Sequence, residues 1–170
     1  ECGYANFESS YHNLNKMEIQ KLEGLREIWN KRDFGNVRTL DDAIDTYKLA
    51  LLCLTRMEYL KLTIAKVCLR LAWLNRYLDN SEEEIRFLDF AIENFTKAYS
   101  TENIEDSEEL IVLYILGEIN RRRGNYNDAI KWFDQVLKHK DIKRKRHIEI
   151  RARNQWHECR EEYKKIKSIG

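Results

Sequence analysis

The stretch that decides the fold is Leu116–Phe133, with the sequence LGEINRRRGNYNDAIKWF. Two apolar-periodic segments flank the pair Gly124-Asn125, and such a pair between periodic segments is typical of a helix end followed by a new helix. Gly117 stands on the first segment and Ala129 on the second. A small residue on each of two helices lets the helices pack closely, while larger side chains fill the space beside them. The stretch therefore predicts a helical hairpin.

The order of residues in this stretch is similar to a tetratricopeptide repeat, whose pattern is Leu-Gly, a glycine turn, then Tyr, Ala and Phe, here Tyr126, Ala129 and Phe133. Related strings occur earlier in the chain, at Ala43, Tyr47 and Ala50, and more weakly at Ala72, Leu88 and Ala91, with Glu84 in place of the expected alanine. The equivalent positions 43, 84 and 129 are 41 and 45 residues apart, against an ideal period of about 34 residues. The resemblance implies an α-α superhelix with longer repeats.

Amphipathic segments with a period near 3.6 extend from this stretch in both directions. We expect helices over residues 13–31, 40–57, 59–78, 81–99, 107–123, 126–138 and 143–167. The fourth begins with Ser81 and has Glu84 three residues on, which matches a capping box. The chain is therefore predicted to be all-α, with about three helical hairpins and a C-terminal capping helix that covers the last hairpin.

The composition agrees with this class. The 170 residues include no proline and only 6 glycines, and a chain without these turn residues is not all-β. A net charge of +1 gives no overall attraction to nucleic acid or membrane, and no window approaches the ~18 apolar residues of a membrane span. Cys53, Cys68 and Cys159 fall on apolar stripes, where we expect reduced thiols in a cytoplasmic protein.

The two ends of the chain carry a second resemblance. The opening Cys2-Gly3-Tyr4-Ala5-x-Phe7-Glu8 looks like the end of a zinc ribbon, in which a Cys-x-x-Cys-Gly knuckle brings two thiolates to one metal. With the hairpins behind it and the closing Arg151–Trp156 (RARNQW), the chain resembles the bacterial proteins of domain-of-unknown-function family 2225. That resemblance implies a four-cysteine zinc ribbon followed by a tetratricopeptide-like region, without an established activity.

The resemblance also predicts the domain organisation. We expect residues 1–12 to be the remnant of an upstream zinc ribbon and residues 13–170 to be the helical repeat domain. The chain begins without methionine, so we expect a piece of a longer protein. Cys2 is then a zinc ligand only in the full-length protein, because one thiolate with His12 nearby is not a structural zinc site. We expect no cofactor in this fragment.

The sequence gives no sign of catalysis. It contains no His-Glu-x-x-His, no phosphate-binding glycine loop and no Gly-x-Ser-x-Gly. His157 and Cys159 are two residues apart, so on a helix they point to different faces and do not form a nucleophile pair. We therefore expect a protein that is not an enzyme.

The first helices of stacked hairpins line a concave groove, which suits an extended or helical peptide. The repeat alignment assigns to this groove the residues Lys66, Leu69, Trp73, Arg76, Tyr77, Tyr114, Glu118, Arg121 and Arg122. Exposed Trp, Tyr and Arg often anchor interfaces, and Arg binds carboxylates through two bonds. We expect a protein or peptide partner of acidic character. The alternative for Trp73 and Tyr77 is packing against an adjacent helix.

A basic segment supports the competing hypothesis, a nucleic-acid-associated protein that uses this patch together with the upstream zinc ribbon. The patch consists of Lys138, Lys140, Lys143, Arg144, Lys145 and Arg146. A solvated helix face is the other interpretation, because no aromatic residues alternate with these charges to stack on bases. Self-association is the third possibility.

Overall fold

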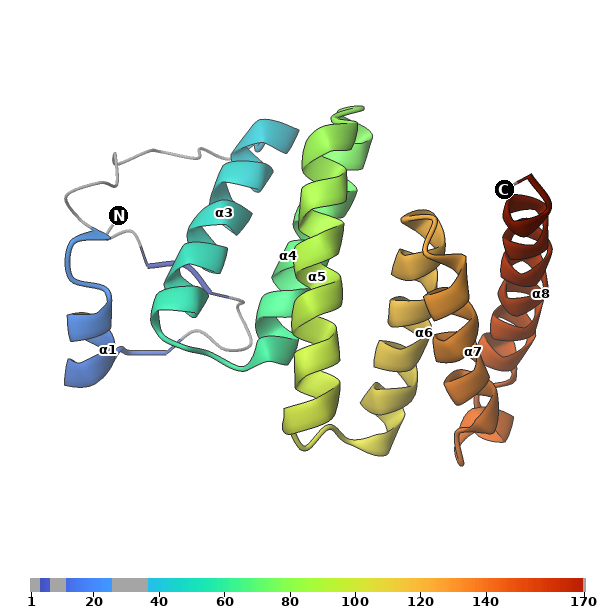
Figure 1. Cartoon of the computed structure of the whole chain (residues 1–170). Helices are drawn as coiled ribbons and strands as arrows, with labels where there is room; N and C mark the ends of the chain where they lie inside the picture. The colour runs from blue at the N-terminus through green and yellow to red at the C-terminus, as the bar shows by residue number, and fades with distance from the viewer. Residues whose placement is uncertain (1–3, 7–11, 26–36, 170) are drawn as a thin grey trace. The chain divides into compact units, whose positions relative to one another are not determined.

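The computed structural model describes residues 4–6, 12–25 and 37–169 (Figure 1). Over these ranges the chain forms helices and no strand, which confirms the all-α class. The elements are α1 (Lys16–Lys21), α3 (Leu40–Arg56), α4 (Lys61–Tyr77), α5 (Ser81–Thr101), α6 (Asp106–Arg122), α7 (Tyr126–Lys138), the 3-10 helix η2 (Ile142–Arg144) and α8 (Arg146–Ile169). The chain divides into two compact units, Glu1–Asn94 and Phe95–Gly170, with the boundary inside α5.

The first unit begins with a helix shorter than predicted. Asn15 caps α1 in a capping box with Glu18, and the helix ends at Lys21 rather than near residue 31. The reason is Gly24, whose φ of 82° lies in the left-handed region that stops a helix. The rest of the predicted first helix lies outside the described residues.

The helices α3 and α4 pack against each other in this unit. Thr39 caps α3 and forms a capping box with Asp42, since each side chain accepts the other residue's backbone N–H at 3.0–3.1 Å. The two helices bury an apolar core that includes Leu54, Ala65 and Leu71, all with no exposed surface. Burial of these side chains is the main source of stability for the hairpin.

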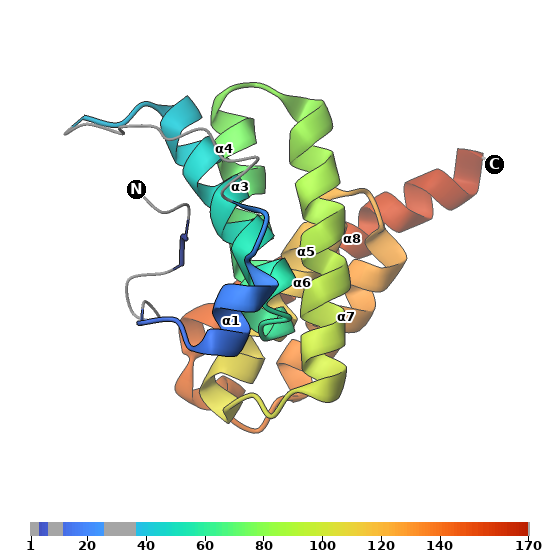
Figure 2. The ribbon, with the colours of Figure 1, turned by 90° about the vertical axis from the view of Figure 1, so that its left-hand side faces the viewer.

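The start of α5 differs from the sequence prediction in its cap. Asn80 provides the cap, because its side-chain oxygen accepts the N–H of Glu83 at 3.2 Å. Ser81 is the first helical residue. Glu84 turns toward α4, where it pairs with Arg76 at 2.9 Å, so its role is an ion pair between helices. Figure 2 shows α4 and α5 as neighbouring helices joined by a short turn.

Three helix-to-helix turns use the same device. Each turn has one residue with φ between 53° and 77°, followed by a residue whose N–H donates to the carbonyl five residues earlier at 2.9 Å. The left-handed residues are Glu58, Asp79 and Gly124, and the bonds run from Tyr59 to Leu54, Asn80 to Asn75 and Asn125 to Asn120. This bond closes the end of one helix while the chain reverses into the next.

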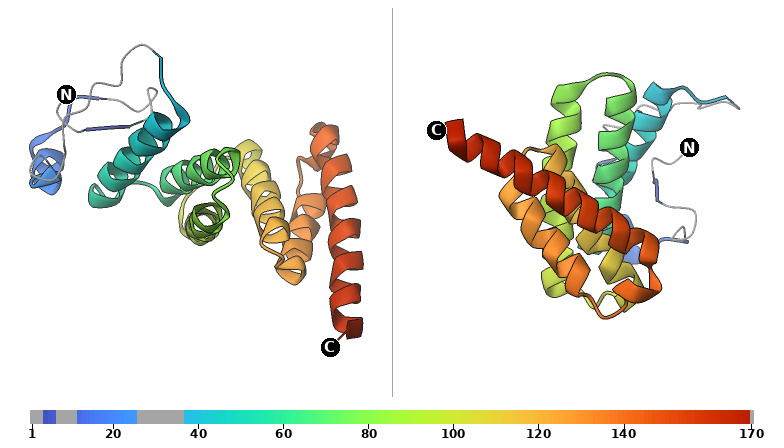
Figure 3. Two further views of the ribbon diagram at one scale, coloured as in Figure 1. Left: turned by 90° about the horizontal axis from the view of Figure 1, so that it is seen from above. Right: turned by 90° about the vertical axis from the view of Figure 1, so that its right-hand side faces the viewer.

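In the second unit α7 packs against both α6 and α8 (Figure 3). Its core contains buried residues from all three helices, among them Leu110, Phe133 and Ala152. The predicted close approach of α6 and α7 is confirmed at Gly117, where a Cβ atom would lie 2.5 Å from the ring of Phe133. Glycine is therefore required so that the aromatic ring can rest on the backbone of α6.

The predicted last helix, 143–167, is divided in two. The chain forms the short helix η2 and then bends at Lys145, whose φ of −114° and ψ of 54° are not helical. The long helix α8 follows and packs along α7. Ala152 and Cys159 on its inner face are fully buried, so α8 covers an apolar side of the α6–α7 hairpin.

Candidate functional site

The predicted groove residues fall into two sets, one on α4 in the first unit and one on α6 in the second. Within the α4 set Leu69 is buried, so it belongs to the core of the first unit rather than to its surface. Lys66 is exposed, and Tyr77 is 77% exposed. Trp73 is half-buried under the guanidinium of Arg70, which lies 4.8 Å from the ring centre.

Arg76 is held within the first unit. Its Nε and Nη2 atoms each lie 2.9 Å from Oε1 of Glu84, whose side chain is only 9% exposed. A carboxylate removed from water in this way is stable because the guanidinium pairs with it. The main role of Arg76 is therefore to neutralise Glu84.

The α6 set forms a chain of hydrogen bonds. Tyr114 donates its hydroxyl proton to Oε1 of Glu118 at 3.0 Å, and Nη2 of Arg121 donates to Oε2 of the same carboxylate at 3.3 Å. Burial raises the pKa of Tyr114 to about 12, and the charge of Glu118 adds to this effect. The phenol therefore stays protonated at neutral pH and acts as a donor. Arg122, the fourth member, is exposed at the end of α6.

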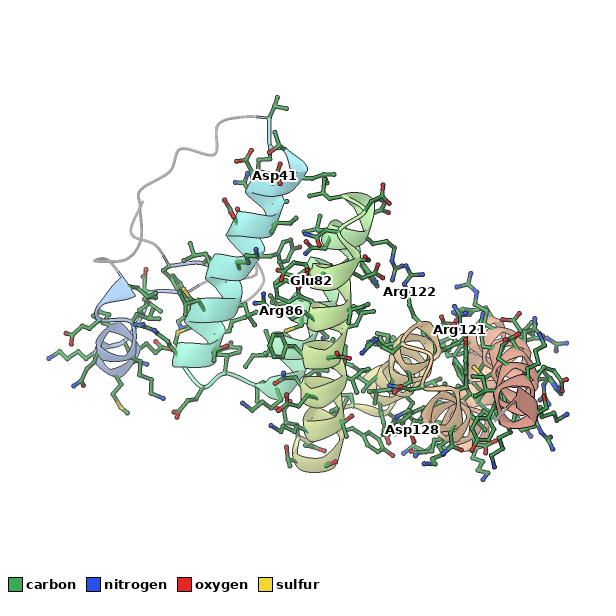
Figure 4. The ribbon with its side chains drawn as sticks, turned by 45° about the horizontal axis from the view of Figure 1, so that its top comes forward. Asp41, Glu82, Arg86, Arg121, Arg122 and Asp128 are labelled. Carbon is green, nitrogen blue, oxygen red and sulfur yellow. The ribbon has the colours of Figure 1, made fainter. Side chains whose placement is uncertain are left out.

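The helix α8 places two further residues, Arg151 and Gln155, on the side of this hydrogen-bonded cluster, and the sequence prediction missed both. The charge of Arg151 acts on Tyr114, and the charges of Arg121 and Glu118 act on Cys159, so these parts of α6 and α8 face each other. Gln155 lies one turn before Cys159 on the same side of α8. We call the surface formed by Tyr114, Glu118, Arg121, Arg151 and Gln155 the α6/α8 face. Figure 4 shows Arg121 on the side of α6 that faces α8.

Two buried polar atoms of the α6/α8 face have no hydrogen-bond partner among the described residues. They are Nε of Arg121, a donor, and Oε1 of Gln155, an acceptor. A buried polar atom without a partner costs about 1–3 kcal/mol, and proteins rarely keep one without a reason. The α6/α8 face therefore carries one unpaired donor and one unpaired acceptor among the described residues.

The predicted basic patch is partly neutralised by acidic residues of its own unit. Lys140 lies 2.5 Å from Asp106, and Arg144 lies 3.1 Å from Asp141. The other four members, Lys138, Lys143, Lys145 and Arg146, are exposed. A pocket of about 430 Å³ beside them is lined by Glu105, Asp106, Ser107, Leu110, Asp141, Arg144 and Lys145. Acidic and basic groups alternate there, so the surface lacks the single sign of charge that follows a phosphate backbone.

The described residues contain no group of three or more His, Cys, Asp or Glu side chains placed to hold a metal ion. His12 is engaged with Glu18 at 3.1 Å, and Cys2 lies outside the described ranges. Cys53, Cys68 and Cys159 are buried. Burial raises the pKa of the Cys68 thiol to about 12 and that of Cys159 to about 11, so neither is a thiolate at neutral pH.

The fold and this surface define an all-helical protein of antiparallel hairpins with a polar face between α6 and α8. Among its described helices none is both long and apolar enough to cross a lipid bilayer. The chain belongs to the family described as uncharacterized protein conserved in bacteria (DUF2225), whose family model matches residues 1–159. The family resemblance predicted from the two ends of the chain is therefore confirmed. No curated protein and no solved structure matches the chain.

Proposed function

We propose that this protein is a non-catalytic scaffold that binds a protein or peptide on the α6/α8 face. The observation that carries the proposal is the pair of buried, unsatisfied polar atoms, Nε of Arg121 and Oε1 of Gln155, beside the half-buried Tyr114. Tyr and Arg are enriched among the residues that dominate binding energy at protein interfaces. A peptide bond supplies both a donor and an acceptor, which matches the two open positions.

The internal repeat supports the same proposal. The α4–α5 and α6–α7 turns are offset by 45 residues at every position from the buried Asn75 and Asn120 to the following Asn80 and Asn125. Repeated helical hairpins of the tetratricopeptide kind bind peptides along their first helices. In the second unit the first helix of the hairpin is α6, which carries three of the five residues of the α6/α8 face.

The alternative function, nucleic-acid association through the basic segment, has weaker support. Two of its six predicted members are paired with Asp106 and Asp141. A surface that binds phosphates without sequence preference presents unpaired cations and aromatic stacking platforms. Peptide binding is therefore the function that the side chains favour.

The proposal needs no cofactor within this chain. We expect zinc only in a longer protein, where Cys2 would be one of several ligands. One thiolate alone cannot form a structural zinc site. Cys53, Cys68 and Cys159 are buried, and buried thiols without a disulfide framework are typical of the reducing cytoplasm, which we propose as the compartment of the protein.

The test is site-specific photo-crosslinking in a bacterial lysate. A photoreactive amino acid replaces Arg151, an exposed residue of the face, or Glu161, an exposed residue of α8 that lies half a helical turn away from Ala152. We expect a protein adduct from position 151 that survives nuclease treatment and is absent from position 161. An adduct that disappears with nuclease, or equal adducts from both positions, contradicts the proposal. An adduct only with a second copy of the chain identifies self-association instead.

A further inference from the structure

We infer that the α6/α8 face takes an extended peptide with a carboxylate, which replaces Glu118 on the guanidinium of Arg121 while a peptide N–H donates to Oε1 of Gln155. This inference rests on the proposed function and specifies the chemistry of its partner. In the free protein Glu118 occupies Arg121 as an internal substitute for the ligand.

The hydrogen bond between Arg121 and Glu118 is weak. Only Nη2 of Arg121 bonds to Glu118, at 3.3 Å, which is longer than the usual 2.7–2.9 Å of a charge-assisted bond. The other carboxylate oxygen accepts the hydroxyl of Tyr114. A guanidinium binds a carboxylate best through two parallel N–H bonds, so Arg121 gains bonds when a ligand carboxylate takes the place of Glu118.

Arg121 differs from its counterpart one repeat earlier in the carboxylate that its Nε meets. Arg76 lies 45 residues before Arg121, and its Nε is bonded to Glu84. The residue 45 positions after Glu84 is Ala129, which is fully buried and carries no charge. The first unit therefore supplies its own carboxylate to the arginine, whereas the second unit lacks this carboxylate and leaves Nε of Arg121 without a partner among its described residues.

The ion pair of Arg121 and Glu118 is accessible from solvent and lies in positively charged surroundings. The side chains of Arg121 and Glu118 are 34% and 29% exposed, so a ligand reaches the end of the guanidinium from solvent, and rotation of the arginine side chain then presents Nε. The positive charge of Arg151 acts on the same cluster. An acidic ligand is favoured because it adds negative charge beside two arginines and one glutamate.

The open acceptor of the face favours a peptide over a phosphodiester backbone. Oε1 of Gln155 is a buried acceptor, and it needs a donor. A peptide provides a main-chain N–H group at almost every residue, whereas the phosphate groups of a nucleic-acid backbone provide only acceptors. A peptide with a carboxylate is thus the ligand class that satisfies both open atoms of the face.

The experiment selects peptides from a random library on the chain and measures their affinities by calorimetry. Each selected peptide is then synthesised with its Glu or Asp residues replaced by Gln or Asn, and with a C-terminal amide or a free acid. These arms distinguish a side-chain carboxylate from a terminal one. The peptide changes leave the protein untouched, so a folding defect cannot explain their effect.

Three variants of the chain test the exchange. We expect Arg121→Met to weaken binding at least about tenfold, because a bond to a charged group is lost. Glu118→Gln keeps an acceptor for Tyr114 and removes the internal competitor, so binding becomes roughly threefold to tenfold tighter. Gln155→Met weakens binding by about threefold to tenfold, whether or not the peptide keeps its carboxylate. Arg153→Met and Glu161→Gln, two exposed charges of α8 outside the face, are the matched controls and leave the affinity unchanged.

A direct readout accompanies the affinities. The Nε–H signal of Arg121 in nitrogen-15 NMR moves when the acidic peptide is added and stays in place with its amide-substituted form. This inference is overturned if the selected peptides are neutral or basic, or if their affinity is unchanged by Arg121→Met. The proposed function is compatible with either result. Selection of no peptide at all overturns both.

Discussion

The α4–α5 and α6–α7 hairpins are built on one backbone plan with different side chains. In each hairpin a buried asparagine near the end of the first helix donates its amide to the carbonyl four residues earlier, Asn75 to Leu71 and Asn120 to Leu116, both at 2.8 Å. The two hairpins differ at the equivalent positions of the second helix, where Glu84 stands in one and Ala129 in the other. The arginine of the first hairpin thus pairs with a buried carboxylate of the second helix, whereas Arg121 pairs through Nη2 with Glu118 of its own helix and its Nε has no partner among the described residues.

A second difference lies at the closest approach of the helices. The α6–α7 hairpin has Gly117 under the ring of Phe133, and the equivalent pair of the α4–α5 hairpin is Ala72 and Leu88. A larger residue on one helix is thus matched by a smaller one on the other. The comparison shows that packing and charge are set pair by pair across the hairpin, while the turn between the helices is constant.

The largest effect is expected at Phe133. Phe133→Ala should lower the free energy of unfolding of the second unit by about 3–5 kcal/mol, because it leaves a cavity in the core. Gly117→Ala should cost about 1–3 kcal/mol in the natural chain, since the new methyl group meets the ring, and should gain up to about 1 kcal/mol in the Phe133→Ala background, where only helix propensity counts. Urea unfolding of the four proteins measures the cycle. An equal effect of Gly117→Ala in both backgrounds would show that the ring does not set this position.

The next effect concerns the ion pair of the α4–α5 hairpin. Arg76→Met should cost about 1–3 kcal/mol, because the buried carboxylate of Glu84 loses its partner. Glu84→Ala copies the residue of the other hairpin and should cost less, since Arg76 is 39% exposed and is solvated when the carboxylate is absent. Thermal unfolding followed by circular dichroism compares the two variants. The reverse order of stability would mean that Glu84 has a further role in its unit.

The buried asparagines should have equal effects. Asn75→Ala and Asn120→Ala each remove one buried side-chain hydrogen bond, which costs about 1 kcal/mol. Amide hydrogen exchange of α4 and α6 reports the loss in each unit separately. A much larger cost at Asn120 would indicate that its additional 3.4 Å contact with the side chain of Asn125 also matters.

The smallest effects are expected at the turns, and they have opposite signs. Asp79→Gly should stabilise the first unit by up to about 1 kcal/mol, because a non-glycine residue at φ 54° is strained. Gly124→Ala should destabilise the second unit by about 1 kcal/mol, although no atom lies within 4 Å of the added methyl group. Denaturant midpoints of the two variants measure these shifts. A change of the same sign in both would contradict the equivalence of the turns.

Sequence periodicity was sufficient to predict the helices, but it was insufficient to predict which residues form the α6/α8 face. The segments predicted from 40 to 138 agree with α3 to α7 within two residues at each end, because long amphipathic stripes and the Gly124 turn are local signals. Gln155 and Arg151 were missed since they lie beside the apolar stripe of α8, and only the packing of α8 brings them to α6. The partner of Glu84 was missed for the same reason: it stands on another helix.

The three buried thiols give each unit its own natural reporter of local opening. Cys68 has 1% of its surface exposed in the first unit, and Cys159 has none exposed in the second. A thiol-specific reagent can reach either sulfur only when the surrounding helices separate, so the labelling rate under native conditions measures the free energy of that opening. In a Cys2→Ser background, mass spectrometry of the labelled peptides that contain Cys53, Cys68 and Cys159 would follow both units of one molecule at once. Ligand binding at the α6/α8 face should then slow the labelling of Cys159, which lies behind that face.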